Sequence, residues 1–87
     1  MEGIVYIGKK PVKNYVVAVL AQLTNNNKVT IKARGKAIAK AVDVAEIVRN
    51  RVLRNIKIEN IEIGTDKVKD KDGRDINISY ISITLSK

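Results

Sequence analysis

The sequence predicts an α/β fold, α+β in stricter usage, in which one mixed four-stranded sheet carries two helices on one face. Three observations support this prediction. Apolar residues repeat with a period of two in some segments and at helical spacing in others. The two kinds of segment follow one another as strand, helix, strand, helix, strand, strand. The last two segments flank an Asp-Gly pair, which favours a tight hairpin turn. The predicted architecture is a two-layer sandwich with a projecting hairpin.

The chain begins with a predicted strand, a basic turn and a helix. Residues 4–7 are branched and aromatic and are followed by Gly8, a pattern typical of a buried strand. Pro11 suits the first position of a helix, because the N–H that it lacks would be unpaired there in any case. The helix is expected to end near residues 25–27. Its apolar residues at helical spacing are Val12, Val16, Val19, Leu20 and Leu23.

A second strand and a second helix follow. In residues 28–34 a period of two directs one set of side chains inward and the cations Lys28, Lys32 and Arg34 outward. Gly35 ends this strand. The inward set is Val29, Ile31 and Ala33. The predicted apolar stripe of the second helix is Ile38, Val42, Ala45, Val48 and Val52, widened by Ala41 and Val44.

The last two strands show changes of phase. Apolar residues stand at 56 and 58 and then at 61 and 63, which indicates a bulge or a strand edge around Asn60. The final strand changes phase between Tyr80 and Ile81, so the two strands are expected to bend together. With both helices on one face, the other face stays partly open, and dimerisation would cover exposed apolar surface.

Length and composition limit the function. Its 87 residues suit one domain, 1–87, and the absence of Cys and His excludes disulfides, thiolate or imidazole metal sites, and catalysis by either residue. Asp43 and Glu46 are interpreted as helical ion-pair partners of Lys40 and Arg49. We therefore predict no catalytic residue, no metal and no cofactor. The chain shows neither a signal peptide nor an 18-residue apolar stretch, which indicates a soluble, intracellular protein.

Charge is the strongest functional signal. The 17 Lys and Arg residues against 9 Asp and Glu give a formal charge of +8, which attracts polyanions, nucleic acid first and an anionic membrane second. Every charged residue from Gly3 to Val42 is basic, which favours a binding surface over a merely solubilising one. These cations are Lys9, Lys10, Lys13, Lys28, Lys32, Arg34, Lys36 and Lys40.

The turn Gly8-Lys9-Lys10-Pro11 precedes a predicted helix N-terminus, where the helix dipole and free N–H groups favour phosphate. The turn is either a phosphate clamp or an ordinary loop, and it lacks the second glycine and the Lys-Ser/Thr pair of a P-loop. Tyr6 and Tyr15 are predicted to lie in the core. With Tyr80 as the third and last aromatic residue, we expect no stacking platform for bases and a broad, backbone-directed mode of binding.

The predicted hairpin is rich in both signs of charge. One interpretation is a neutral surface loop, and the other is an arm whose cations reach along a groove of nucleic acid. Its cations are Lys67, Lys69, Lys71 and Arg74, and its acids are Asp66, Asp70, Asp72 and Asp75.

Four segments together resemble the Alba family of archaeal chromatin proteins, also called the Sac10b family, over essentially the whole chain. They are IGKKPVKNYV at 7–16, IKARGKAIAKAVDVAEIVRNR at 31–51, IEIG at 61–64 and DGR at 72–74. The resemblance implies a non-enzymatic homodimer that binds double-stranded DNA with little sequence preference and coats or compacts the chromosome. RNA is the alternative partner, as in an RNA chaperone or a ribonucleoprotein subunit. The implied location is the cytoplasm, on the nucleoid, with no membrane partner.

The resemblance also assigns roles to residues. It implies nucleic-acid contacts from Lys9, Lys10 and the block that carries Lys32, Arg34 and Lys36, and from Arg74 and its neighbours in the hairpin. It implies acetylation at Lys9 or Lys10, and hence an acetyltransferase and a deacetylase as partners. The implied contacts within or between dimers, which would allow higher assembly along DNA, are Val48, Arg51, Val52 and Leu53. Relatives often carry a bulky aromatic residue where this chain has Val52, and often Pro where it has Arg54.

Overall fold

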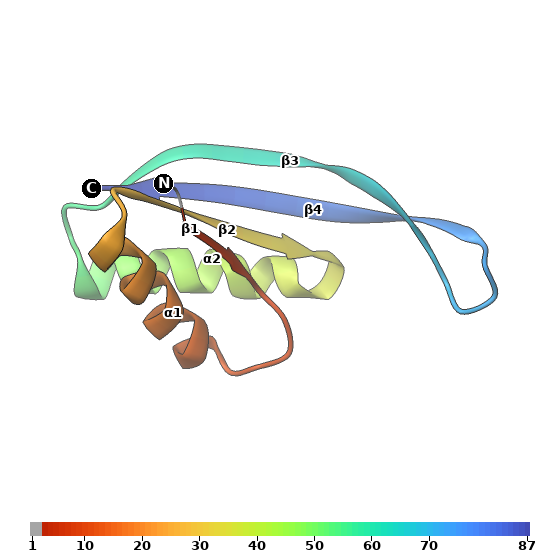
Figure 1. The fold of residues 1–87 in the computed structure, drawn as a ribbon, viewed down its shortest axis with the longest axis horizontal. Coiled ribbons are helices and arrows are strands. Elements are labelled where there is room, and N and C mark those ends of the chain that lie inside the picture. The colour runs from red at the N-terminus through yellow and green to blue at the C-terminus, as the bar shows by residue number, and fades with distance from the viewer. Residues whose placement is uncertain (1–2) are drawn as a thin grey trace.

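A computed structural model describes residues 3–87, and its elements follow the predicted order (Figure 1). Residues 1–2, which the expected domain includes, lie outside the described residues. The α+β prediction is confirmed. The elements are β1 (Gly3–Tyr6), α1 (Val12–Asn25), β2 (Lys28–Arg34), a 3-10 turn (Gly35–Ala37), α2 (Ile38–Ile47), a π-helical turn (Val48–Val52), β3 (Lys57–Lys69) and β4 (Asp75–Ser86).

The four strands form one mixed sheet in the order β1-β2-β4-β3. β1 and β2 are parallel, whereas β4 runs antiparallel to both β2 and β3. Both helices lie on one face of this sheet, and the β3–β4 hairpin projects beyond them (Figure 1). The hairpin makes the molecule elongated, with a longest dimension of 44 Å against 23 and 20 Å for the other two.

The core lies between the sheet and the helices, as the alternation in the sequence predicted. Val29 and Ile31 of β2 and Leu85 of β4 are fully buried beneath the helices. Lys32 and Arg34 lie on the opposite face of β2, which we call the open face of the sheet. The open face therefore carries the cations of β2, and the helical face carries the core.

The predicted stripe of the second helix is wrong at two positions. The buried residues are Ala41, Val44, Ala45 and Val48, whereas Val42 and Val52 are 41% and 46% exposed. α2 ends at Ile47, and the chain continues in a wider turn closed by a 2.8 Å hydrogen bond from the backbone N–H of Leu53 to the carbonyl of Val48. Val52 is the last residue of this π-helical turn and lies outside α2, so the α-helical spacing used for the prediction does not apply to it.

The bulge predicted around Asn60 is confirmed, since the pairing of β3 with β4 shifts register between Ile58 and Asn60. β4 is continuous from Asp75 to Ser86, and its pairing with β3 shows no second shift of register, so the expected matching bend stays a prediction. The change of phase in β4 separates its two faces. Ile81, Ile83 and Leu85 face the helices, whereas Ile76, Ile78 and Tyr80 lie on the open face.

β3 is an edge strand, and the helices pack against the other three strands. Ile61 and Ile63 pair with Ile83 and Ile81 and so point to the helical side of the sheet. They are nevertheless 54% and 76% exposed. Two large apolar side chains are thus left on the surface along one edge of the molecule.

Candidate nucleic-acid interface

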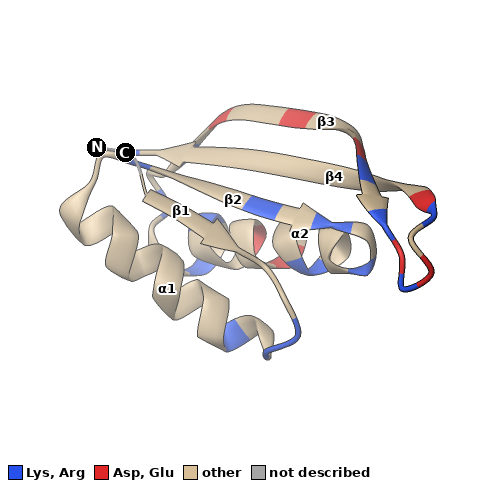
Figure 2. Cartoon of the chain, turned by 45° about the vertical axis from the view of Figure 1, so that its right-hand side comes forward, with Lys and Arg blue, Asp and Glu red and all other residues tan. Residues whose placement is uncertain are grey.

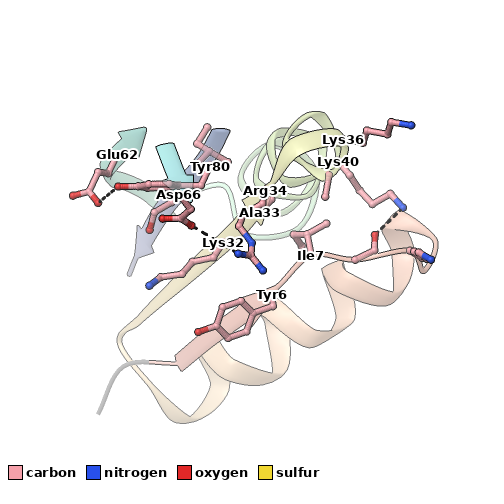
Figure 3. A pocket seen from close by; sticks show the side chains of 15 residues that line it. Tyr6, Ile7, Lys32, Ala33, Arg34, Lys36, Lys40, Glu62, Asp66 and Tyr80 are labelled. Atoms are coloured by element: carbon pink, nitrogen blue, oxygen red, sulfur yellow. Dashed lines mark hydrogen bonds and ion pairs between the residues drawn. The ribbon is translucent and has the colours of Figure 1, made fainter. Parts of the chain in front are cut away.

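The fold gathers cations from three separate segments around one open cavity of about 1000 Å³. The turn after β1, the end of β2 and the start of α2 each line it, and each carries blue, basic residues in Figure 2. Five of the predicted site residues meet there, as Figure 3 shows for four of them by label. The five are Lys9, Lys32, Arg34, Lys36 and Lys40.

The turn between β1 and α1 is held in shape by the side chain of Tyr15. The Tyr15 hydroxyl accepts hydrogen bonds from the backbone N–H groups of Gly8, at 2.9 Å, and Lys10, at 3.1 Å. The Tyr15 ring is buried, as predicted. The hydroxyl therefore fixes the turn that carries Lys9 and Lys10, a role that sequence periodicity could not reveal because its partners are backbone groups.

Lys40 holds the same turn from the other side. Its ammonium group donates to the carbonyl of Lys10 at 2.7 Å and to that of Gly8 at 3.3 Å, and it lies 6.0 Å from the centre of the Tyr15 ring, within range of a cation–π interaction. The side chain of Lys40 therefore positions the turn. Its predicted pairing with Asp43 is replaced by these two carbonyls.

The turn leads directly into the N-terminus of α1. Pro11 caps the helix without a side-chain hydrogen bond, and its first turn contains no acidic residue. Lys9, Lys10 and Lys13 are all exposed at this end of the helix. The positive end of the helix dipole and three exposed ammonium groups thus face solvent together, an arrangement that attracts phosphate.

Acidic residues of β3 border the cations of β2. Asp66 lies 4.0 Å from Arg34, and Glu59 lies 2.7 Å from Lys28. Both pairs are substantially exposed, so each contributes little to stability and a phosphate group can compete for the cation. Neither pair could be predicted from the sequence, because each joins residues that are far apart in the chain. At the end of α2, in contrast, the predicted pair of Glu46 with Arg49 of the π-helical turn is confirmed at 3.0 Å.

The prediction that Tyr6 lies in the core is wrong. Its side chain is on the open face and is 69% exposed, because the core is formed by Val5 of β1 and by Ile7, which follows the strand, whereas Tyr6 between them points to the other side. Tyr80 also lies on the open face, with its hydroxyl 3.4 Å from a carboxylate oxygen of Glu62. The negative charge of Glu62 is the main reason why the pKa of Tyr80 is raised above its ordinary value, so this phenol stays neutral.

The hairpin cations do not join the cavity. Lys67, Lys69, Lys71 and Arg74 are exposed on the projecting arm. Lys69 pairs with Asp75 at 3.0 Å, and Arg74 pairs with Asp72 at 3.4 Å. Figure 2 shows both signs of charge alternating around the tip. The arm is therefore a second, locally neutralised surface, separate from the basic cavity.

The expectation that Val48 contacts a second copy of the chain is wrong. Val48 is fully buried in the core of its own chain and has no surface to offer a partner. Of the other three residues in that expectation, Arg51 and Val52 are exposed and Leu53 is partly buried. If this segment contacts a second copy, the contact is made by the residues that follow Val48.

Across residues 3–87 the structure contains no group of His, Cys, Asp and Glu side chains that could hold a metal ion. Over the same range, no helix is long and apolar enough to cross a membrane.

A basic cavity beside a helix N-terminus, on an α+β sandwich, is the surface of a protein that binds polyanions. The Alba family model matches residues 3–65, and the chain belongs to the Alba family, whose members are binding proteins and not enzymes. The prediction that the chain is not an enzyme is thereby confirmed.

Similarity to individual members extends over the whole chain. The sequence is 49% identical to "DNA/RNA-binding protein Alba" of Methanococcus maripaludis, covering 100% of both chains, and 51% identical to the protein of that name from Thermoplasma acidophilum, covering 99% of this chain and 97% of the relative. The solved structure "Alba from Thermoplasma volcanium" superposes with a TM-score of 0.91 at 50% identity, over 98% of this chain and 100% of the other. ALBA1 from Trypanosoma brucei, at 20% identity and a TM-score of 0.75, shares the fold over 98% of this chain and 68% of its own.

Proposed function

We propose that this protein binds double-stranded DNA through the phosphate backbone, with little sequence preference, and coats or compacts the chromosome in the cytoplasm. The observation that carries the proposal is the convergence of Lys9, Lys32 and Arg34 on one cavity beside the N-terminus of α1. Lysine and arginine contacts to phosphate position a protein on a duplex without reading its sequence. RNA is the second candidate partner, supported by relatives that are named DNA/RNA-binding proteins.

Salt dependence tests the phosphate-contact mode. If about six phosphates are contacted per chain, a plot of log affinity against log salt concentration is expected to have a slope of about −5 on duplex DNA, because each contact releases condensed counterions. The measurement is a fluorescence-anisotropy titration at several salt concentrations. The same titration with unrelated duplex sequences is expected to give the same affinity and slope. A slope near zero would contradict the proposal.

The proposal includes a homodimer that uses the exposed edge of β3. Ile61 and Ile63 are large apolar side chains on the helical side of the sheet, and solvent exposure of a contiguous apolar edge favours its burial against a second copy. Val42, exposed on α2, adds apolar surface on the same side of the sheet. The open face with its cations stays free in such a dimer.

The dimer is testable by substitution at this edge. Ile61→Asp combined with Ile63→Asp is expected to yield a folded monomer, because two buried carboxylates in an apolar interface are strongly disfavoured. Light scattering coupled to size-exclusion chromatography measures the molar mass. Thr65→Asp, at an exposed position on the same side of the same strand, is the control and is expected to leave the mass unchanged. A dimer that survives both Ile substitutions would place the interface elsewhere.

We also propose that acetylation of Lys9 or Lys10 lowers the affinity for nucleic acid, with an acetyltransferase and a deacetylase as partners. Both ammonium groups are exposed and so are accessible to an enzyme. Acetylation removes a single positive charge, so its effect is expected to be smaller than that of reversing the charge.

A further inference from the structure

The open face of the sheet carries two tyrosines on either side of the β2 cations. Tyr6 of β1 pairs with Lys32, and Tyr80 of β4 pairs with Arg34. Residues paired directly across neighbouring strands point to the same side, so each aromatic ring stands beside one cation on the face that the helices leave uncovered (Figure 3). Aromatic rings interleaved with cations are the arrangement with which proteins hold unpaired bases.

Tyr80 lies across the sheet over Gly64. A Cβ atom added at Gly64 would stand 2.5 to 2.6 Å from the hydroxyl, Cζ and Cε2 atoms of Tyr80, so the ring occupies the space that any other side chain would fill. One side of the ring therefore rests on the backbone of β3, and the hydrogen bond to Glu62 holds its phenol end. Tyr80 as a whole is partly exposed.

The side chain of Tyr6 is accessible to a base without a supporting contact of the kind that holds Tyr80. Its side chain is 69% exposed and lines the same open cavity as Tyr80 and the β2 cations. The two rings come from strands two positions apart in the sheet and from rows two residues apart along it. With a strand spacing of about 4.8 Å and a rise of about 3.3 Å per residue, their Cα atoms are about 12 Å apart. That separation gives two places for two different bases.

Charge divides the face into two sides. Lys32 and Arg34 stand between the two tyrosines, whereas Glu62 and Asp66 lie toward the edge strand β3. Phosphates are attracted to the two cations of β2 and repelled by the two carboxylates of β3. A strand that follows the β2 cations would turn its bases toward the rings and toward carboxylates that accept hydrogen bonds from base amino groups.

We propose that the open face binds unpaired bases of a single strand of nucleic acid, with one base stacked on Tyr6, another on Tyr80, and their phosphates on Lys32 and Arg34. The site rests on the proposed nucleic-acid binding but adds a ligand that duplex binding does not require. Bases inside a duplex are stacked on one another and cannot reach the rings. Looped or frayed segments of RNA and single-stranded DNA both present the required chemistry.

The test compares two probes on the same variants. The variant Tyr6→Leu with Tyr80→Leu removes both rings and keeps apolar bulk. For an oligo(A) strand of about 12 nucleotides, its affinity is expected to fall about 100-fold, at roughly tenfold per ring, whereas a duplex of equal length is expected to bind within about threefold of the wild type. Tyr6→Phe with Tyr80→Phe is the matched control, because it keeps both rings and is expected to retain single-strand binding.

A second measurement uses the wild-type protein and does not depend on the folding of a variant. The chain has three tyrosines and no tryptophan, and Tyr15 is buried, so stacking on Tyr6 and Tyr80 is expected to quench most of the intrinsic fluorescence when oligo(A) is added. Running the titration with ribose and deoxyribose strands shows which polymer the site prefers.

The outcomes separate the two proposals. Selective loss of single-strand binding with quenching in the wild type supports the stacking site. Unchanged single-strand binding in the leucine variant, equal loss of both probes, or absence of quenching overturns it and leaves duplex binding intact as a proposal. Failure of the wild-type protein to bind either probe overturns the proposed function itself.

Discussion

Reversing both turn lysines, by Lys9→Glu with Lys10→Glu, is expected to weaken binding to duplex DNA about 100-fold. Each charged contact to phosphate contributes about 1.4 kcal/mol or more, which is about tenfold in affinity per lysine. The plot of log affinity against log salt concentration is expected to lose about 2 units of slope, since two fewer counterions are released. The loss is expected to be the same for every duplex sequence, because phosphate contacts carry no sequence information. Fluorescence anisotropy over a salt series measures both quantities.

A matched control separates a specific contact from a change in net charge. Lys57→Glu with Lys87→Glu alters the formal charge by the same amount at two exposed positions near the opposite end of the β2–β4 pairing. It is expected to reduce affinity only several-fold. Equal losses in the two double variants would show that the turn acts merely through bulk charge and is not a phosphate clamp.

Replacing Tyr15 by Phe is expected to destabilise the protein by about 2 kcal/mol, because the hydroxyl accepts two hydrogen bonds from partly buried backbone donors. For a domain of this size, that corresponds to a fall of about 8 to 16 °C in Tm. The affinity for DNA is also expected to fall, by about threefold to tenfold, because the turn that carries Lys9 and Lys10 becomes less ordered. The slope against salt should stay unchanged, since no phosphate contact is removed.

Two further variants test this prediction, one as a control and one at the second support of the turn. Tyr6→Phe makes the same chemical change at an exposed position and is expected to leave Tm unaltered. Lys40→Met removes the ammonium that donates to the carbonyls of Gly8 and Lys10 and is expected to resemble Tyr15→Phe in both stability and slope. If Lys40→Met instead lowers the slope by about one unit with no change in Tm, Lys40 is a phosphate contact and not a support of the turn.

The two supports of the turn connect the core to the surface. Tyr15 belongs to the buried face of α1, and Lys40 lies on α2, yet both make their polar contacts with the backbone of Gly8 and Lys10 in the same turn. The packing of α1 against α2 therefore sets the position of Lys9 and Lys10. A basic turn that looks like a flexible loop in the sequence is held from two sides in the fold.

Much of the fold could be predicted from patterns that depend on near neighbours. The period of two in β2 correctly separated its core residues from Lys32 and Arg34, because successive side chains of a strand point to opposite faces. The shift of phase at Asn60 correctly marked the bulge. Helical spacing failed at two positions for different reasons: Val42 is offset on α2 from the buried face of Ala41, Val44 and Ala45, and Val52 lies in the π-helical turn, where α-helical spacing does not apply.

For the binding surface, the sequence determined the kind of ligand. An acid-free run of cations from Gly3 to Val42, with a basic turn before Pro11, favours an anionic partner whatever the details of the fold. The tertiary structure decided which cations act together. It brought Lys9, Lys32 and Lys36 to one cavity and kept the hairpin cations apart. It also turned Lys40 into a support and exposed Tyr6. These outcomes depend on contacts between segments that are far apart in the chain, such as Tyr6 with Lys32 and Lys10 with Lys40, and such contacts are set by how the sheet and helices pack.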